Sequence, residues 1–366
     1  MASGVVSGLL GAPHSIADAV PTFALAWIDP EGRLTTSVSG DARRWSPPRR
    51  HAAAIRSRNG PALAFDGSGG WRVFWFTPGR GAIASSQAIG NAASRLRLGP
   101  VRLHAIPQHH RPLAAPTVRP AVAHDGRRWT LAYRNHRPGS ITIARSGADD
   151  AAPWTYRTLS GAGGWITPPA LAYGNGALLL AYTVAAPGQA APTGYQIRIR
   201  RSADGLTWSP AVTPKHMIGG AGSKPPLYVA PVQGPALAFA GDSFLLAATG
   251  RRDPSAPRFL YRYLVFGSAD GARWRKRSGD LGIWSTTRVA VGMATTATDG
   301  CLAVAVTSSR PSGGAAARNI HIRRGTAPEP CGRASGIRWA HPNAAFATRA
   351  MLDRFVAVAY GAARSP

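Results

Sequence analysis

The chain of 366 residues contains little cysteine and little acid. Two cysteines are too few for the disulfide framework that stabilises many small secreted domains. Only two of the 16 acidic residues are glutamates, Glu31 and Glu329, so a mechanism that needs paired carboxylates has few candidates. No run of the sequence approaches the roughly 20 apolar residues of a membrane-spanning helix, so we expect no membrane span.

Positive charge is abundant by contrast. Lysine and arginine number 43, which gives a net charge of +27, and only three of these residues are lysine. The cations are spread along the whole chain, whereas a nucleic-acid-binding protein more often gathers them on one helix or face. We therefore expect nonspecific attraction to polyanions but no specific nucleic-acid partner. The hydrophobic share of 45% is large enough for a folded core.

Residues 1–20 are interpreted as an N-terminal extension, either a leader remnant or a segment outside the domain. They include a short apolar run but lack the cationic start of a signal peptide. Cys301 and Cys331 form either a disulfide or two reduced thiols, and their spacing does not decide between these alternatives.

A five-residue apolar phrase recurs along the chain, and it is the strongest signal in the sequence. Its copies are PALAF at 61–65, PAVAH at 120–124, PALAY at 169–173 and PALAF at 235–239, with weaker copies at 292–296 and 344–348. Several are followed by Asp-Gly or Asn-Gly, which favour two-residue hairpins. A second apolar run comes next, at 71–76, 129–134, 177–183, 243–249, 301–307 and 354–360. Short runs bounded by glycine and proline predict β-strands.

More polar runs predict the third and fourth strands of each repeat. The third strands are expected at 34–39, 83–88, 140–145, 195–201, 261–267 and 319–323, and short fourth strands often begin with tryptophan, at Trp45, Trp154, Trp208 and Trp274. Four strands that become more polar outward, repeated every 50–65 residues or so, are typical of β-propeller blades. We expect an all-β, single domain over residues 21–366, with six four-stranded antiparallel blades or, alternatively, seven. Residues 344–360 are expected to join residues 23–45 and close the ring.

The turns between third and fourth strands carry a motif. Residues 202–208 (SADGLTW) and 268–274 (SADGARW) share Ser-x-Asp-Gly-x-x-Trp, and residues 39–45 and 146–154 are degenerate copies. Here Ser and Asp can bond turn amides, Gly supplies a positive φ, and Trp can pack between blades. The motif resembles the Asp-box (BNR) repeat of the sialidase-like propeller superfamily. The resemblance implies a ligand at the channel mouth opposite these turns, and it favours a secreted or extracytoplasmic location.

Loops at that mouth supply the candidate ligand-binding residues. Arginines there suit a carboxylate, phosphate or sulfate, and aromatic rings suit a sugar. The candidates are Arg119, Arg134, His136, Arg251, Arg288, Arg310, Trp165, Trp284 and Trp339. The alternative interpretation is solvated loop arginines and tryptophans that pack blades together.

The resemblance also implies a catalytic set that this sequence matches poorly. Sialidase-like enzymes carry an arginine triad, an Arg-x-Pro motif, an Asp acid/base and a Tyr nucleophile assisted by Glu. Residues 58–61 (RNGP) are one residue too long for the motif, and Arg119-Pro120 is one too short. The remaining candidates for catalysis are Asp29, Glu31, Asp253 and Tyr228.

We therefore predict a propeller that binds a glycan or another small anionic ligand without the hydrolytic set. The alternatives are a divergent exo-sialidase or glycoside hydrolase, or a propeller recruited to other small-molecule enzymology. The loop with His104, His109 and His110 has no neighbouring carboxylate or thiol, so we interpret it as solvated and expect no metal or other cofactor. The sequence does not indicate an oligomeric state.

Overall fold

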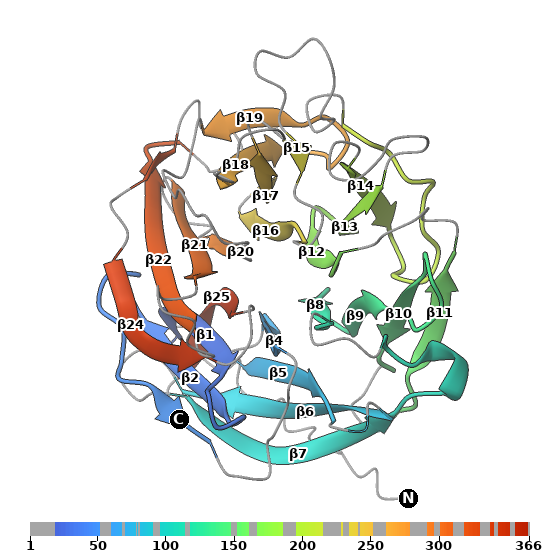
Figure 1. Ribbon diagram of the computed structural model, residues 1–366, viewed down its shortest axis with the longest axis horizontal. Helices are drawn as coiled ribbons and strands as arrows, with labels where there is room; N and C mark the ends of the chain where they lie inside the picture. The colour runs from blue at the N-terminus through green and yellow to red at the C-terminus, as the bar shows by residue number, and fades with distance from the viewer. Residues whose placement is uncertain are drawn as a thin grey trace, which may run out of the picture.

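The computed structural model describes residues 19–51, 60–67, 70–77, 79, 81–90, 96–113, 118–147, 152–160, 167–185, 195–214, 228–229, 234–240, 242–251, 261–278, 291–295, 301–309, 318–329, 337–339, 343–351 and 356–364. Its strands form antiparallel sheets arranged radially around a central opening (Figure 1). The predicted all-β propeller is confirmed.

Each sheet runs outward from an inner strand and is named below by that strand. The inner strands are β4 (Ala62–Phe65), β8 (Ala121–His124), β12 (Ala170–Gly174), β16 (Ala236–Ala240), β20 (Val291–Thr295) and β25 (Ala357–Arg364). The second strands, in the same order, are β5 (Trp71–Phe76), β9 (Trp129–Arg134), β13 (Ala177–Ala185), β17 (Ser243–Arg251), β21 (Cys301–Ser309) and β1 (Ala19–Ile28). The third strands are β6 (Ala82–Ile89), β10 (Ile141–Arg145), β14 (Tyr195–Ser202), β18 (Tyr261–Ser268), β22 (Arg318–Ala327) and β2 (Leu34–Ser39).

The outer strands are less regular. They are β7 (Arg97–Ala105), β11 (Thr155–Leu159), β19 (Arg275–Ser278), β23 (Arg338–Trp339) and β3 (Arg49–Arg50), while β15 (Tyr228–Val229) and β24 (Asn343–Met351) are additions to β17 and β22. The β12 sheet has three strands in the described residues, with an isolated bridge between Ile199 and Val212 beside it. The nine-residue β7 was not predicted, because no tryptophan marks its start. A 3₁₀ turn, η2 (Gln108–His110), follows β7.

The two ends of the chain close the ring in one sheet. Strand β25 pairs with β1 over eight residue pairs, including Phe23 with Tyr360 and Leu25 with Val358. The predicted junction is therefore correct, but its strands were misassigned. Residues 344–348 lie in β24, which pairs with β22, and the inner strand is β25. The apolar alternation of residues 356–360 (VAVAY) is a better copy of the recurring phrase, and it leaves β1 as a second strand.

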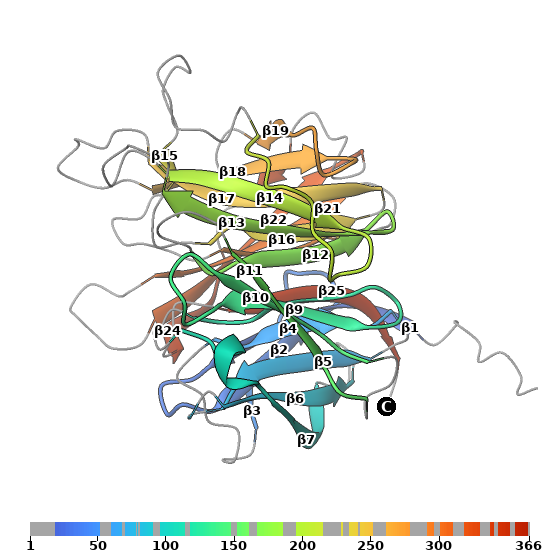
Figure 2. The same cartoon turned by 90° about the vertical axis from the view of Figure 1, so that its right-hand side faces the viewer.

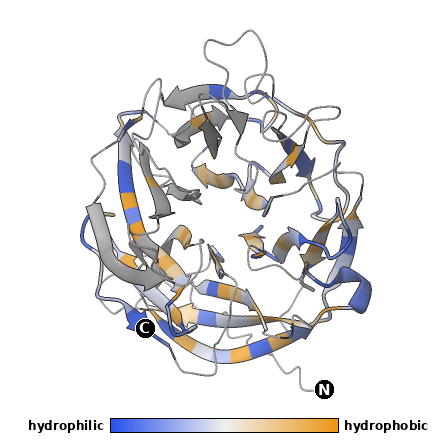
Figure 3. Ribbon diagram, in the orientation of Figure 1, coloured by the Kyte–Doolittle hydropathy of each residue, from blue (hydrophilic) through white to orange (hydrophobic). Residues whose placement is uncertain are grey.

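Apolar side chains fill the spaces between adjoining sheets. Because side chains alternate along a strand, Ala62 and Ala64 of β4 pack towards the β8 sheet, while Leu63 and Phe65 pack towards the β25 sheet. Five such clusters, each drawing on two neighbouring sheets, are present in the described residues. Figure 3 shows the inner strands β12 and β16 as mainly hydrophobic and β11 and η2 as hydrophilic. In the side view of Figure 2, the strands of the β12 and β16 sheets lie above those of the β8 and β4 sheets.

The two-residue hairpin predicted after the apolar phrase occurs at Asn175-Gly176, where both residues have positive φ, 47° and 69°. The turns after β4 and β8 are longer than predicted. Asp66 and Asp125 close them through side-chain hydrogen bonds to the amides of Gly70 (3.0 Å), and of Arg127 (2.9 Å) and Arg128 (2.8 Å), respectively. Side-chain acceptors thus replace the tight-turn geometry at these two sites.

Candidate functional site

In the described part of the chain, two cavities lie along the axis of the ring and share one set of lining residues, the waist. The waist consists of one Leu or Val from each of five inner strands: Leu63, Val122, Leu171, Leu237 and Val358. The cavity at the start of the inner strands, the entry cavity, has a volume of about 80 Å³. The cavity at their ends, the turn cavity, has a volume of about 400 Å³. The larger space therefore lies at the end opposite the predicted ligand mouth.

Arg119 is the charged residue that the structure places at the entry cavity. It precedes β8, is partly buried, and shares the cavity with alanine, proline, leucine and valine side chains. No other charged residue of the described chain lines this space. The low polarity of the other walls strengthens electrostatic attraction between a guanidinium and an anion.

Arg134 is the last residue of β9, and His136 lies in the loop from β9 to β10, at the same end of the β8 sheet. Burial lowers the pKa of the Arg134 guanidinium. Asn135, between them, donates from Nδ2 to the carbonyl of His109 (3.2 Å) and to Oγ1 of Thr142 (2.7 Å). His136 is exposed, and its amide donates to the carbonyl of Arg111 (3.0 Å). The loop is therefore fixed against the segment that follows β7.

The histidine loop is less solvated than predicted. His109 is exposed, but His110 is buried, with its Nδ1 3.0 Å from Oγ1 of Thr158 and its ring stacked on Tyr156 at 5.6 Å between centroids. Burial lowers the pKa of His110, with smaller contributions from His109 and Arg137. The interpretation of a fully solvated loop is wrong for His110, because this side chain fills a space against β11.

The carboxylates of Asp29 and Glu31 share one arginine. Arg50 lies 3.1 Å from Oδ2 of Asp29 through Nε and 3.3 Å from Oε2 of Glu31 through Nη2. Asp29 is buried, and its Oδ1 accepts the amide of Arg33 at 2.8 Å, while the Glu31 side chain is half exposed. This arrangement ties the β1–β2 turn to β3, and neither residue lines the two axial cavities.

The backbones of two other candidates are brought together. Tyr228 of β15 pairs with Arg251 at the end of β17. Trp339, by contrast, lies in β23, the outermost strand of the β20 sheet, and packs against Gly325 of β22. It was expected in a loop that enters an inner strand, and the structure places it at the rim because residues 338–339 extend the sheet edge. Trp165, Asp253, Trp284, Arg288 and Arg310 lie outside the described residues, as does Cys331.

The turn cavity was not predicted from the sequence, although the signal is present. The last residue of the recurring phrase is aromatic in five sheets: Phe65, His124, Tyr173, Phe239 and Tyr360 line the cavity. Four of these rings contact the ring of the residue that faces them on the second strand, at 4.4–5.2 Å between centroids. The facing rings are Phe23, Trp71, Trp129 and Phe244, and all four are buried.

The turns that carry the Ser-x-Asp-Gly motif have the expected hydrogen bonds. Ser202 Oγ donates to Asp204 Oδ1 (3.0 Å) and accepts the amide of Gly205 (2.8 Å), while Asp204 accepts two further amides. Gly205 has φ +75°, and the indole of Trp208 donates to its carbonyl (3.2 Å). The turn at 268–274 repeats every one of these contacts. These hydrogen bonds favour the ionised form and lower the pKa of Asp204.

Tryptophans at these turns pack between adjoining sheets, as expected. Trp208 contacts the cluster between the β8 and β12 sheets, and Trp274 belongs to the cluster between the β12 and β16 sheets. Trp45 and Trp154 take the same place at two other junctions.

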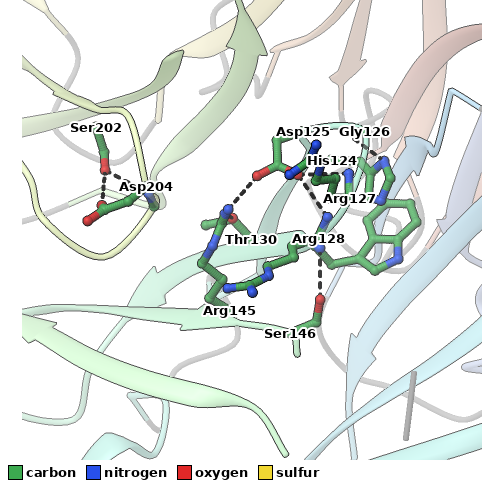
Figure 4. Close-up of polar contacts among 12 residues, drawn as sticks. His124, Asp125, Gly126, Arg127, Arg128, Thr130, Arg145, Ser146, Ser202 and Asp204 are labelled. Carbon is green, nitrogen blue, oxygen red and sulfur yellow. Dashed lines mark hydrogen bonds and ion pairs between the residues drawn. The ribbon is translucent and has the colours of Figure 1, made fainter. Parts of the chain in front are cut away.

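A buried ion pair connects the β8 sheet to the next turn. Arg145 pairs with Asp125 and donates to Oγ1 of Thr130 (Figure 4). Its side chain and that of Asp125 are only 7% and 13% exposed. The same guanidinium lies against the Cα of Gly205, in the turn at residues 202–208 of the β12 sheet. Hydrogen bonds from Arg145 and from the turn amides lower the pKa of Asp125 against the opposing effect of burial.

No group of three or more histidine, cysteine or acidic residues in the described part of the chain could hold a metal ion. In the same residues no helix is long and apolar enough to cross a membrane.

No family model matches the chain, and no curated protein matches it in sequence. Solved structures that are similar in fold include a Hadza microbial sialidase, 13% identical with a TM-score of 0.48 over 91% of this chain and 73% of that one. An α-L-arabinanase of Penicillium chrysogenum is 10% identical, with a TM-score of 0.44 over 76% and 91% of the two chains. A Trypanosoma rangeli sialidase is 12% identical, with a TM-score of 0.41 over 72% and 45%. Sialidases are thus among the structures to which this chain is similar, at a level that assigns no activity.

Proposed function

We propose that the chain binds a small anionic ligand, such as an acidic sugar, at the entry cavity. The observation that carries this proposal is the position of Arg119, a partly buried arginine that lines a concave site with otherwise apolar described walls. A guanidinium offers a carboxylate two parallel hydrogen bonds, and apolar walls suit the faces of a sugar ring. The loop that holds Arg134 and His136 is at the same end of the β8 sheet and supplies further cationic or polar groups.

Hydrolysis of a glycoside is the less favoured of the two candidate functions. A glycosidase places two carboxyl groups, or a carboxyl group and a tyrosine, on either side of the scissile bond. Asp29 and Glu31 instead hold Arg50 in the β1–β2 turn, outside both axial cavities. A role in binding therefore agrees better with the described acids than a role in catalysis.

The test is a titration with N-acetylneuraminic acid, glucuronic acid and neutral galactose, followed by calorimetry. We expect the acids to bind and galactose to bind more weakly. Arg119→Met should weaken acid binding about tenfold or more, because one charge-assisted hydrogen-bonded contact is lost.

Arg127→Met is the matched control, since Arg127 is exposed in the β8–β9 turn at the other end of the sheet. The Arg127→Met protein should bind the acidic sugars with the same affinity as the unchanged protein. Failure of every acid to bind, or equal losses in the two variants, would refute the proposal.

We also infer that the ring is one domain of six blades. Support comes from the six sheets of the described residues and from contacts between consecutive inner strands in the cyclic order β4, β8, β12, β16, β20, β25 and back to β4. The alternative of seven blades depends on the apolar run at residues 23–29, which is one second strand more than the six predicted. Strand β1 contains residues 23–28 of this run and takes the second position in the β25 sheet.

A further inference from the structure

The turn cavity has features of a ligand site that the proposed function does not use. Its volume of about 400 Å³ is within the range of small-molecule pockets. It lies beyond the waist from Arg119, so it is separate from the entry cavity. The apolar waist forms its floor, and the five half-buried rings at the ends of the inner strands form its wall. We call these rings the aromatic collar: Phe65, His124, Tyr173, Phe239 and Tyr360.

Four collar rings are held in place before any ligand arrives. Phe65 contacts the buried ring of Trp71 at 5.2 Å between centroids, and Phe239 contacts the buried ring of Phe244 at 4.7 Å. Each pair is directly cross-strand, so the second strand supports the ring that reaches the cavity. A ligand would therefore meet rings that have already lost much of their rotational freedom, which reduces the entropic cost of binding.

His124 is held by its neighbours on two sheets. Its Nδ1 accepts the amide of Gly126 at 3.3 Å, and its ring also hydrogen bonds with the backbone of Asp66 in the β4 sheet. One nitrogen accepts and the other donates, so the imidazole is neutral in this arrangement. Burial agrees with this state, because it lowers the pKa of His124.

The charges around the cavity disfavour ions of either sign. The charged side chains that line it are the carboxylates Asp66 and Asp125, and no described lysine or arginine lines it. Carboxylates repel an anion. Arg145 neutralises Asp125, and the chain as a whole carries +27, so an organic cation gains little there and is repelled from a distance.

We propose that the turn cavity binds an uncharged ring with one apolar face and a hydroxylated edge, and that a neutral sugar residue is this ligand. The collar would contact the apolar face. The hydroxyl groups of Tyr173 and Tyr360 and the carboxylate of Asp66, all on lining residues, supply donors and an acceptor for the edge. The proposal concerns a different cavity from the proposed function and stands without it.

The experiment measures saturation transfer from the aromatic protons of the protein to the methyl glycosides of galactose, glucose and arabinose. Glucosamine serves as the charged counterpart, because the proposed function already predicts that the entry cavity binds acidic sugars. We expect transfer to at least one neutral glycoside, strongest at the protons of one ring face, and weaker transfer to glucosamine.

Tyr173→Leu removes one collar ring but keeps an apolar side chain, and it should weaken neutral-sugar binding about tenfold. Tyr173 faces Leu178 and not another ring, so this change leaves the four cross-strand pairs intact. Tyr156→Leu, at a half-buried tyrosine of β11 that is not on the collar, is the control and should bind normally.

Three results would overturn the proposal. They are no transfer to any neutral glycoside at millimolar concentration, preferential transfer to glucosamine, and equal affinities of the Tyr173→Leu and Tyr156→Leu proteins. The first two need only the unchanged protein, so they hold even if a variant folds poorly.

Discussion

Glycines with positive φ occupy turns whose surroundings differ sharply. Gly205 has φ +75°, and a Cβ added there would collide with the guanidinium of Arg145. Gly126 has φ +89°, and a Cβ there would meet nothing within 4 Å. Ala42 takes the position of Gly205 in the degenerate turn at 39–45, with φ +58°. The left-handed backbone is therefore tolerated by alanine, and the neighbouring side chain decides how much a substitution costs.

Gly126→Ala and Gly205→Ala separate these two contributions. We expect Gly126→Ala to lower the free energy of unfolding by about 1 kcal/mol, which is the cost of an L-residue in the left-handed region. Gly205→Ala should cost at least 1–2 kcal/mol more, on the order of an overpacked site, because Arg145 must move away from Asp125. Urea denaturation of both variants measures the difference. Equal losses would show that Arg145 does not constrain this turn.

His51 gives the fold a dependence on pH. It is buried, with Nε2 2.8 Å from Oγ1 of Thr36, and burial, with a smaller effect of Arg49, lowers its pKa to about 4 from the ordinary 6.5. Between these values the unfolded chain binds a proton that the folded chain does not. Neutral His51 therefore stabilises the fold above pH 6.5, and this contribution is lost as pH falls towards 4.

We expect His51 to contribute a slope of about 1.4 kcal/mol per pH unit to the stability between pH 6 and 4.5. His51→Gln should flatten the curve of unfolding free energy against pH by up to one proton in this window. Parallel curves for His51→Gln and the unchanged protein would contradict the assignment.

Strands were predictable where the sequence repeats a local physical pattern. The second strands 71–76 and 129–134 and the third strand 34–39 agree with β5, β9 and β2 residue for residue, because alternation and flanking glycines mark them. Strand β7 was missed since its nine residues are mostly exposed and carry no apolar run. Strand β25 was assigned to the second position because the second strand predicted at 354–360 includes the phrase-like residues 356–360, and nothing local shows pairing with a strand more than 300 residues away.

Candidate site residues were less predictable than strands. Arg119 lies at a cavity, while Asp29 and Glu31 are bound by Arg50, a partner that no spacing in the sequence indicates. Trp339 extends a sheet edge. Each ring of the aromatic collar is the last residue of a copy of the recurring apolar phrase, so the signal was present in the sequence. The convergence of these rings on one cavity depends on closure of the ring of sheets.

The pair of Asp125 and Arg145 connects two elements of the β8 sheet at a buried position. Asp125→Asn keeps an acceptor for the amides of Arg127 and Arg128 but removes the charge. We expect a loss of about 3 kcal/mol in the free energy of unfolding, because a buried guanidinium is left without its counter-charge. Asp270→Asn makes the same change in an exposed turn that also binds two amides, and it should cost less than about 1 kcal/mol.

Adding Arg145→Met to Asp125→Asn should recover part of the stability, since the uncompensated charge is then removed. Chemical denaturation of the single and double variants forms a complete cycle. An Asp125→Asn loss no larger than that of Asp270→Asn would show that the ion pair adds nothing.

At the scale of the whole molecule, the ring depends on the strand that completes it. In β25, Val358 pairs with Leu25 and Tyr360 with Phe23, and the three residues Val356–Val358 are all buried. The side chains of Val356 and Val358 join the cluster between the β25 and β20 sheets, while Ala357 joins the cluster towards the β4 sheet. Loss of this single strand would expose apolar surface of two junctions at once and leave an unpaired edge on β1.

A chain that ends at Val356 should therefore melt at least about 10 °C below the full chain, because several buried apolar side chains lose their contacts. A synthetic β25 peptide (Ala357–Arg364) added in excess should raise the melting temperature again, since it can pair with β1 along the same register. A matched peptide with Val358→Lys is the control, because its charge would be buried against Leu25, and it should not rescue. Full stability of the shortened chain would mean that ring closure contributes little to the fold. Equal rescue by both peptides would mean that the buried face of β25 does not select its partner.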